Sequence, residues 1–238
     1  NSRRARASCD AGPPLTRPPR VAAGDLIALA APAGPFDRPK FEAGLALLQD
    51  LGFRTMVPDA AFAREGYLAG SDRARAETLN RLFADPEVRG IVCARGGYGS
   101  TRLLPHLDLE VIRTHPKVFV GFSDITGLHA VLTHRCRLVT FHGPMVASLP
   151  ETTAEGIAAL GAALLGAIPV MLAPAGGWTI IPGEARGEVA GGNLSLLAHL
   201  VGTPYFPPLA GRILILEDVD EAPYRIDRLL WQLHLAGA

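Results

Sequence analysis

A serine at the end of an apolar strand is the clearest candidate for chemistry in this chain. The apolar run 117–120 stops at Gly121, and Ser123 follows where a helix pattern begins. In α/β hydrolytic enzymes, a bend of this kind exposes a nucleophilic hydroxyl, and the first N–H groups of the helix face the oxyanion that it creates. The match to the G-x-S-x-G pattern is partial, because Ile125 occupies the place of the last glycine. Two interpretations of Ser123 therefore stand side by side: a nucleophile, or the N-cap of a helix over residues 124–136.

A glycine-rich segment, Arg95-Gly96-Gly97-Tyr98-Gly99, follows the predicted strand 88–94. Glycines at a strand end permit positive φ and let a ligand approach the backbone closely. A phosphate-binding P-loop is excluded because no Lys-Ser/Thr follows the last glycine, and a dinucleotide loop is excluded because Arg102 stands where glycine or alanine is needed. The segment is then either a tight turn or a donor of backbone N–H groups to an oxyanion.

Glu217 ends the predicted strand 212–216. A carboxylate at the carboxyl end of a strand is well placed to orient a histidine, as the third member of a nucleophile–base–orienter relay. Because Asp218, Asp220 and Glu221 follow at once, a solvated acidic turn is the competing interpretation.

A serine relay also needs a general base, which is most often histidine. His142 is the best candidate within the chain, since it ends a strand beside the strand that leads to Ser123. His129 follows Ser123 by six residues, which at ~100° per residue is about 240° around the helix, so we expect it to point away.

Short apolar runs alternate with amphipathic segments of helix length, which predicts an α/β fold with a Rossmann-like parallel sheet. Sites in such sheets form at the carboxyl ends of the strands, where the glycine-rich segment and Ser123 both fall. The predicted strands are 26–31, 53–57, 88–94, 117–120, 138–141 and 212–216, and the predicted helices are 38–51, 71–83, 124–133, 154–165, 194–201 and 224–235.

We expect four parts along the chain. Residues 1–20, which are rich in arginine, form a flexible N-terminal extension, and residues 21–150 form the α/β domain that carries Ser123. Residues 151–167 are a linker helix, and residues 168–238 are a smaller, C-terminally truncated α/β domain that carries Glu217. Proline- and glycine-punctuated strands are expected up to Glu188.

Composition narrows the function further. Basic and acidic residues balance at 23 each, so the protein has no net positive charge that would attract nucleic acid or an anionic membrane. The three cysteines have no metal-ligand spacing and indicate reduced thiols in a cytoplasmic protein. The uncharged stretch 156–182 contains three prolines, which argues against a membrane span.

An ordered set of motifs resembles the LD-carboxypeptidase family of serine peptidases, which includes muramoyl-tetrapeptide carboxypeptidase and the microcin-C self-immunity hydrolases. The motifs run collinearly from about Val21 to the end: Gly24-Asp25-Leu26-Ile27 with Ala31-Pro32-Ala33-Gly34, Arg95-Gly96-Gly97-Tyr98-Gly99, Gly121-Phe122-Ser123-Asp124-Ile125-Thr126, His142-Gly143-Pro144-Met145, Gly191-Gly192-Asn193-Leu194-Ser195, Leu216-Glu217-Asp218 and Pro223-Tyr224-Arg225-Ile226-Asp227-Arg228.

The resemblance implies catalytic roles. Ser123 would be the nucleophile, Glu217 would orient the base, and the backbone N–H of Asp124 with one from Gly96-Gly97 would form the oxyanion hole. The reaction would remove terminal D-alanine from murein tetrapeptides through an acyl-enzyme, during cell-wall recycling.

Substrate binding is expected at four side chains. Arg95 and Arg225 are candidates for the free carboxylate of the substrate, although both also fit structural ion pairs, and Tyr98 and Asn193 complete the expected set. No cofactor and no metal are expected, and the resemblance suggests a homodimer.

The sequence departs from the family at the histidine. The family's catalytic histidine comes from a Gly-His segment tens of residues beyond the glutamate, past the last residue of this sequence, and we assign the role to no residue here. These 238 residues alone are expected to have negligible peptidase activity. Two alternatives stay open: a hydrolase of peptidyl-nucleotide antibiotics, and a non-catalytic protein that binds peptidoglycan fragments.

Overall fold

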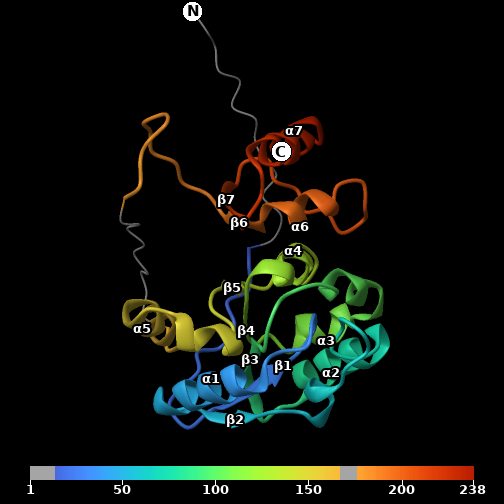
Figure 1. Ribbon diagram of the computed structural model, residues 1–238, viewed down its shortest axis with the longest axis vertical. Helices are drawn as coiled ribbons and strands as arrows, with labels where there is room; N and C mark the ends of the chain where they lie inside the picture. The colour runs from blue at the N-terminus through green and yellow to red at the C-terminus, as the bar shows by residue number, and fades with distance from the viewer. Residues whose placement is uncertain (1–13, 167–175) are drawn as a thin grey trace, which may run out of the picture.

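The computed structural model describes residues 14–166 and 176–238. Within them, a parallel five-stranded sheet with strand order β2-β1-β3-β4-β5 forms the centre of the larger unit (Figure 1). The strands are β1 (Leu26–Ala30), β2 (Arg54–Met56), β3 (Val88–Cys93), β4 (Val118–Gly121) and β5 (Phe141–His142). The predicted α/β fold with a parallel sheet is confirmed.

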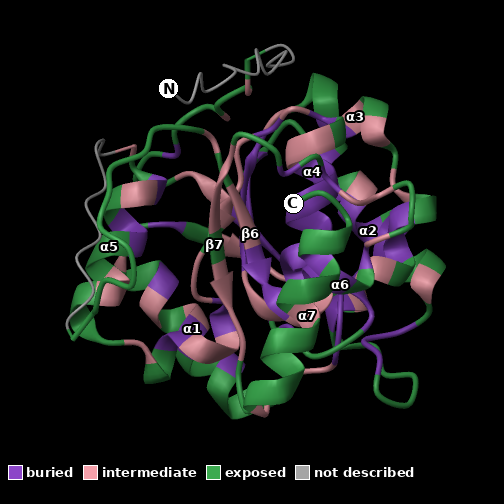
Figure 2. Cartoon of the chain, turned by 90° about the horizontal axis from the view of Figure 1, so that it is seen from above, coloured by how far each residue is buried: buried purple, intermediate pink, exposed green. Residues whose placement is uncertain are grey.

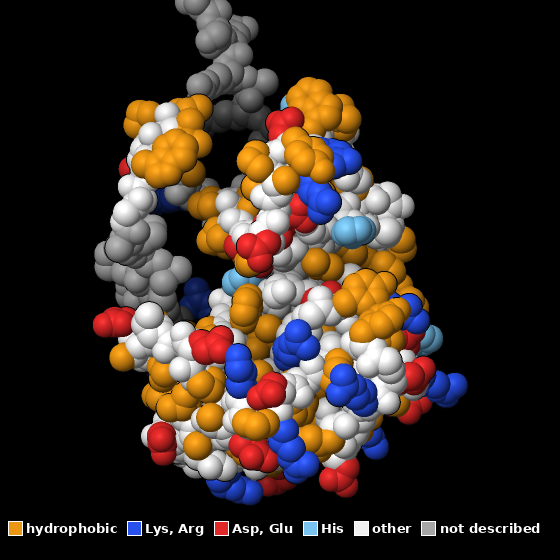
Figure 3. All heavy atoms as spheres, in the orientation of Figure 1, with side chains coloured by type: hydrophobic (Ala, Val, Ile, Leu, Met, Phe, Trp, Pro, Cys, Tyr) orange, Lys and Arg blue, Asp and Glu red, His pale blue; other side chains and the backbone are white. Residues whose placement is uncertain are grey.

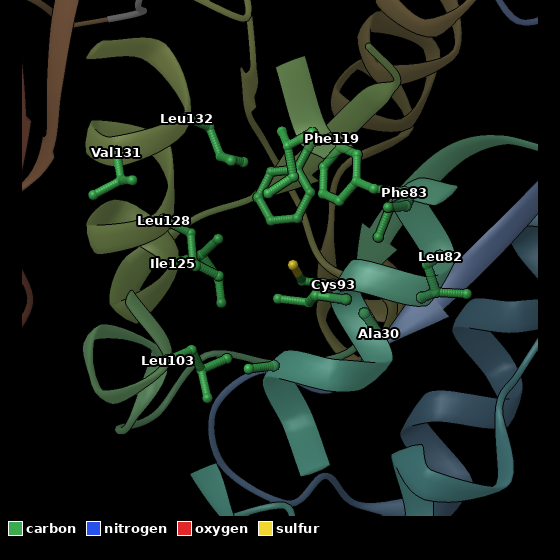
Figure 4. Close-up of a cluster of buried hydrophobic side chains, with 14 of the residues drawn as sticks. Ala30, Leu82, Phe83, Cys93, Leu103, Phe119, Ile125, Leu128, Val131 and Leu132 are labelled. Atoms are coloured by element: carbon green, nitrogen blue, oxygen red, sulfur yellow. The ribbon is translucent and has the colours of Figure 1, made fainter. Parts of the chain in front are cut away.

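The central strands are apolar on both faces because helices cover both sides of the sheet. Along β1, Ile27 and Leu29 join one hydrophobic cluster, whereas Ala28 and Ala30 join the other. This division follows the period of two residues by which side chains alternate across a strand. Figure 4 shows the second cluster, in which Phe119 of the sheet meets side chains from the helices.

The helices divide between these two clusters. The cluster of Ile27 and Leu29 includes side chains of α1 (Arg38–Asp50) and α5 (Ala154–Leu164). The other cluster includes side chains of α2 (Asp72–Ala84), α3 (Leu109–Thr114) and α4 (Thr126–Arg135). Ser71 caps α2, as its sequence predicts, and its hydroxyl accepts from Ala74 N at 3.3 Å.

A smaller unit lies above the large sheet (Figure 1). Its parallel strands β6 (Val189–Asn193) and β7 (Ile213–Glu217) pair with each other, and α6 (Leu194–His199) and α7 (Pro223–Leu235) pack on a small apolar cluster. The backbone N–H of Asn193 donates to Thr126 Oγ1 at 2.9 Å, which joins β6 to the start of α4.

The outer surface of the smaller unit is rich in exposed apolar side chains. Figure 2 shows α7 mostly exposed, and Figure 3 shows hydrophobic side chains gathered on this part of the molecule. The exposed large apolar side chains of α7 are Tyr224, Ile226, Leu230, Trp231 and Leu235.

Three predicted segments differ from the observed ones. The strand expected over 138–141 is shorter and later, because Leu138 forms an isolated parallel bridge with Thr16 and only Phe141–His142 pair with β4. Thr16 thereby attaches part of the expected N-terminal extension to the larger unit. The strands expected up to Glu188 are absent over residues 176–188, and the remainder of that expectation, residues 168–175, lies outside the described residues.

Short helical segments fill loops that the sequence analysis left without structure. Besides α3, these are the 3-10 turns η1 (Asp59–Phe62), η2 (Ser100–His106) and η4 (Val146–Glu151). A further 3-10 turn, η3 (Ser123–Ile125), falls at the start of the predicted helix 124–133. In the described part of the chain, no helix is long and apolar enough to span a bilayer.

Candidate active site

Ser123 occupies a strained bend between β4 and α4. Its φ is +59°, in the left-handed region that residues with a Cβ avoid, while Phe122 before it is extended. The capping interpretation of Ser123 is wrong: an N-cap has extended dihedrals, and neither η3 nor α4 has a side-chain cap. Half-buried Ser123 lines a cavity of about 660 Å³, here called the serine cavity.

The bend is held from behind by His129 of α4. The carbonyl oxygen of Gly121, two residues before Ser123, lies 2.8 Å from His129 Nε2 and accepts from Gly143 N at 3.1 Å. Because a carbonyl only accepts, Nε2 carries the hydrogen, and Nδ1 accepts from Thr140 Oγ1 at 2.8 Å. Burial lowers the pKa of His129 to about 4, with the Gly121 carbonyl opposing, so the ring is neutral near pH 7.

The glycine-rich segment lies directly against Ser123. An ideal Cβ on Gly96 would come within 3.3 Å of Ser123 Oγ and of Met145 Cε, so only glycine leaves this space open. Gly97 has a φ of +102°, as expected for a glycine at a strand end. The segment is fixed by Gly34 N, which donates to Gly96 O at 3.0 Å. The structure therefore brings Gly96 and Gly97 to Ser123, and their oxyanion role stays a prediction.

A buried arginine that the sequence analysis missed anchors the same loops. The guanidinium of Arg75, on α2, donates to the carbonyl of Pro32 at 2.5 Å and to that of Gly99 at 3.0 Å. These two carbonyls belong to the loops after β1 and β3. These two contacts carry no local sequence signal, because Pro32 and Gly99 are 43 and 24 residues from Arg75 along the chain.

The side chain of Asp124 points into the protein. Its Oδ2 accepts from Ser100 N at 2.8 Å, and its carbonyl oxygen accepts from Ser100 Oγ at 2.5 Å. Its Oδ1 is buried and has no hydrogen-bond partner within the described residues. These contacts tie the start of the helical turn to η2 and so hold the Asp124 backbone beside Ser123.

Glu217 lines a second cavity of about 360 Å³, together with His142, His129 and Gly192. Its Oε1 is buried and has no hydrogen-bond partner in the described part of the chain. Burial lowers the pKa of His142, and the charge of Glu217 opposes this change. Glu217 and His142 therefore line the same cavity, whereas Ser123 lines the serine cavity.

His142 is in β5, next to the strand β4 that leads to Ser123, but it has no direct link to the serine. It pairs with Gly121 across the sheet, and its ring centroid lies 6.2 Å from that of Phe122. Across the described residues, no hydrogen bond joins His142 to Ser123 or Glu217. The structure therefore gives no reason to assign it as the base.

The acidic turn after Glu217 has a structural role. Asp218 Oδ2 accepts from Ser195 N at 3.0 Å and from Ser195 Oγ at 2.8 Å, and Asn193 Nδ2 donates to Asp218 Oδ1 at 3.3 Å. Although burial opposes it, these hydrogen bonds and one from Val219 N keep the pKa of Asp218 below its ordinary value. Asn193 also caps α6 by accepting from Leu196 N. Its predicted substrate contact stays a prediction.

The other expected substrate-binding residues are not gathered in one place. Arg95 lines the serine cavity and donates from Nη1 to Pro35 O at 2.7 Å. Tyr98 is half-exposed outside the cavity lining, 5.8 Å from the Tyr67 ring between centroids. Arg225 is on α7, is paired with Glu221 at 3.6 Å, and lines neither cavity.

Three charged residues of the serine cavity were not anticipated: Asp37, Lys40 and Glu151. Lys40 on α1 and Glu151 at the end of η4 line it and form an ion pair at 2.5 Å. They are 111 positions apart, so no local pattern connects them. As for metals, the described residues contain no group of three or more His, Cys, Asp or Glu side chains that could hold an ion.

A strained serine between strand and helix, with glycines against its hydroxyl at the carboxyl end of a parallel sheet, is the arrangement of an α/β serine hydrolase. Comparison with known families makes this specific. The model of the LD-carboxypeptidase N-terminal domain matches residues 27–143, and that of the LD-carboxypeptidase C-terminal domain matches residues 186–238.

Similar proteins agree. A probable murein peptide carboxypeptidase of Bacillus subtilis is 39% identical over 93% of this chain and 70% of its own. The murein tetrapeptide carboxypeptidase of Pseudomonas aeruginosa is 37% identical over 87% of this chain and 70% of its own. The chain belongs to the LD-carboxypeptidase family and is a serine-type carboxypeptidase by that membership.

Solved structures share the fold. An MccF-like protein of Bacillus anthracis has a TM-score of 0.85 at 28% identity, covering 92% of this chain and 76% of that one. The microcin C7 self-immunity protein MccF has a TM-score of 0.82 at 25% identity, covering 94% and 76%. A muramoyltetrapeptide carboxypeptidase of Oxalobacter formigenes has a TM-score of 0.76 at 28% identity, covering 89% and 72%.

Proposed function

We propose that this protein removes the terminal D-alanine from murein tetrapeptides by hydrolysing the amide between an L-centre and that D-alanine. The observation that carries the proposal is the Ser123 hydroxyl, held at a φ of +59° against Gly96 on the wall of a cavity of about 660 Å³. The relatives named for murein peptide and murein tetrapeptide carboxypeptidase activity support the choice of substrate.

The chemistry is acyl transfer. Ser123 Oγ attacks the amide carbonyl while its proton passes to a general base, and the oxyanion accepts from the backbone N–H of Asp124 and from one of the Gly96-Gly97 turn. The base then protonates the leaving amine of D-alanine, and water hydrolyses the acyl-enzyme. Glu217 orients the base. Its Oε1 atom suits that role, because it is buried and has no hydrogen-bond partner among the described residues.

An exopeptidase must also recognise the free carboxylate of the residue that it removes. Arg95 is the candidate, because it lines the serine cavity and has no carboxylate partner within the described residues. Its Nη1 bond to Pro35 O fixes one side of the guanidinium and leaves other N–H donors for a carboxylate. Arg225 is remote from this cavity and is not needed for the role.

The test measures D-alanine by mass spectrometry after incubation of murein tetrapeptide with the protein at its natural length. We expect release by the parent and a loss of about 10³-fold or more in Ser123→Ala. Thr114→Ala is the control, because it removes an exposed hydroxyl at the end of α3 that lines neither cavity and should keep the activity. A parent that releases no D-alanine, or a Ser123→Ala variant that releases it at the parental rate, would refute the proposal.

The similarity to MccF supports a second candidate within the same chemistry, hydrolysis of a peptidyl-nucleotide antibiotic. Incubation with such a compound separates the two, because hydrolysis of it without D-alanine release would favour the second. Binding of the tetrapeptide without hydrolysis of either compound would favour a non-catalytic peptidoglycan-binding protein.

For the cellular setting, we propose a cytoplasmic protein that acts as a homodimer and binds neither nucleic acid nor membrane. The equal numbers of basic and acidic residues and the buried, free thiols of Cys93 and Cys136 support this setting. Sedimentation of the purified protein at several concentrations tests the dimer.

A further inference from the structure

An exposed ion pair stands on the wall of the serine cavity. Lys40 Nζ lies 2.5 Å from Glu151 Oε1, and the two side chains are 55% and 65% exposed. Exposed ion pairs contribute little to folding, because water screens both charges. A charged ligand can therefore replace either partner at little cost to the fold.

The packing of α1 against η4 holds the two charges together. Lys40 and Gly44 are four residues apart on α1 and share one face of the helix. An ideal Cβ on Gly44 would lie 1.8 Å from the carbonyl oxygen of Val146, so glycine alone allows α1 to approach η4 this closely. Glu151 is the last residue of η4, and the close approach therefore sets it opposite Lys40.

The first turn of α1 is also fixed at its start. Asp37 caps the helix, and its carboxylate accepts from the backbone N–H of Lys40 at 3.0 Å. Asp37 lines the serine cavity as well, and it keeps its negative charge beside Lys40 while one of its oxygens caps the helix. The charged side chains that line the cavity are thus Asp37, Lys40, Arg95 and Glu151.

The spacing fits the substrate of the proposed function. Met145 touches the space beside Ser123, and η4 runs from Val146 to Glu151, about 10 Å at 2 Å of rise per residue. From the scissile carbonyl carbon, the side chain of a diamino acid reaches about 6 Å to its distal carbon at roughly 1.25 Å per bond. Ser123, Lys40 and Glu151 line the same cavity, so the side chain of a peptide held at Ser123 shares that cavity with the two charges.

We propose that Lys40 and Glu151 bind the distal end of the diamino acid, with Glu151 accepting from its ammonium and Lys40 donating to its carboxylate. This inference rests on the proposed function and assigns the terminal D-alanine carboxylate to Arg95. The distal end of meso-diaminopimelate carries both charges, whereas that of lysine carries only an ammonium and offers Lys40 no carboxylate to bind. The pair thus selects meso-diaminopimelate tetrapeptide over lysine tetrapeptide.

The test measures binding without turnover, by calorimetric titration of both tetrapeptides into the Ser123→Ala protein. We expect the diaminopimelate peptide to bind at least about fivefold more tightly than the lysine peptide. Adding Lys40→Met should remove most of that preference, and adding Glu151→Gln should weaken both peptides. Arg73→Met and Glu77→Gln, from another exposed ion pair, on α2, that lines neither cavity, should leave both affinities unchanged.

An unchanged ratio of affinities in Lys40→Met, or tighter binding of the lysine peptide by the parent, would overturn the inference. So would the failure of both peptides to bind. The proposed function is tested separately, by measuring D-alanine release from protein that retains Ser123. If that protein releases D-alanine but Lys40→Met leaves the peptide preference unaltered, only the role of the ion pair is refuted.

Discussion

Replacing Ser123 by glycine should stabilise the protein while it abolishes activity. Ser123 carries a Cβ at a φ of +59°, a conformation that costs an L-residue roughly 1–2 kcal/mol and glycine almost nothing. Glycine also loses about 0.5–1 kcal/mol more conformational entropy on folding. The net gain of Ser123→Gly over Ser123→Ala, which keeps the Cβ and the strain, is therefore about 0.5–1 kcal/mol.

Thermal unfolding of the two variants under identical conditions measures this difference. For a chain of this size, a gain of that order raises the Tm of the glycine variant by about 1–4 °C above that of the alanine variant. Both variants should be inactive, since both lack the hydroxyl. Ser148 is the control, because it has no positive φ and lies within η4, so Ser148→Gly should be less stable than Ser148→Ala.

A Ser123→Gly variant that is no more stable than Ser123→Ala would refute the reasoning. The bend would then hold the serine without strain, and the argument that the fold stores conformational energy at this residue would fail. If the glycine variant kept its carboxypeptidase activity, Ser123 would be excluded as the nucleophile as well.

Three further outcomes follow from the contacts. Gly96→Ala places a methyl within 3.3 Å of Ser123 Oγ, so kcat/KM should fall about tenfold or more with little change in Tm, and an unchanged kcat/KM would contradict the assigned geometry. His129 has a pKa of about 4 in the folded protein and 6.5 in the unfolded one, so its contribution to stability is complete above pH 6.5 and is lost as the pH falls toward 4. Urea unfolding should show that His129 makes the protein about 2–3 kcal/mol less stable at pH 4.5 than at pH 7. This part of the pH dependence should be absent in His129→Gln. Asp218→Ala leaves the N–H groups of Ser195 and Asn193 without their acceptor and should cost about 1–3 kcal/mol, whereas Asp227→Ala on the exposed face of α7 should change stability by less than about 0.5 kcal/mol.

Local patterns were enough to locate most of the larger unit. The apolar runs that became β1, β3 and β4 are buried on both faces, and such strands read as continuous apolar segments. Strand β5 was misplaced because a two-residue strand has almost no periodicity, and the neighbouring Leu138 pairs instead with Thr16, more than a hundred residues away. The sequence of an edge strand does not determine which segment it pairs with.

Part of the candidate site could also be predicted from local sequence, and part could not. Ser123, with the glycines after β3, was recognisable because a bend between strand and helix needs particular residue types at adjacent positions. The sequence alone could not decide between capping and catalytic geometry at Ser123, since serine suits both. The positive φ and the absent cap decided this in the structure.

By itself, the sequence determined the α/β class, the order of the elements and the neighbourhood of the reactive serine, because these depend on short-range periodicity and turn chemistry. Tertiary structure alone decided that Lys40 pairs with Glu151 and that His129 donates to the Gly121 carbonyl. It also decided that Asp218 and Asn193 form hydrogen bonds with the backbone of α6. The physical reason is that such contacts depend on how closely distant helices and strands approach, and that distance is set by the packing of the whole core.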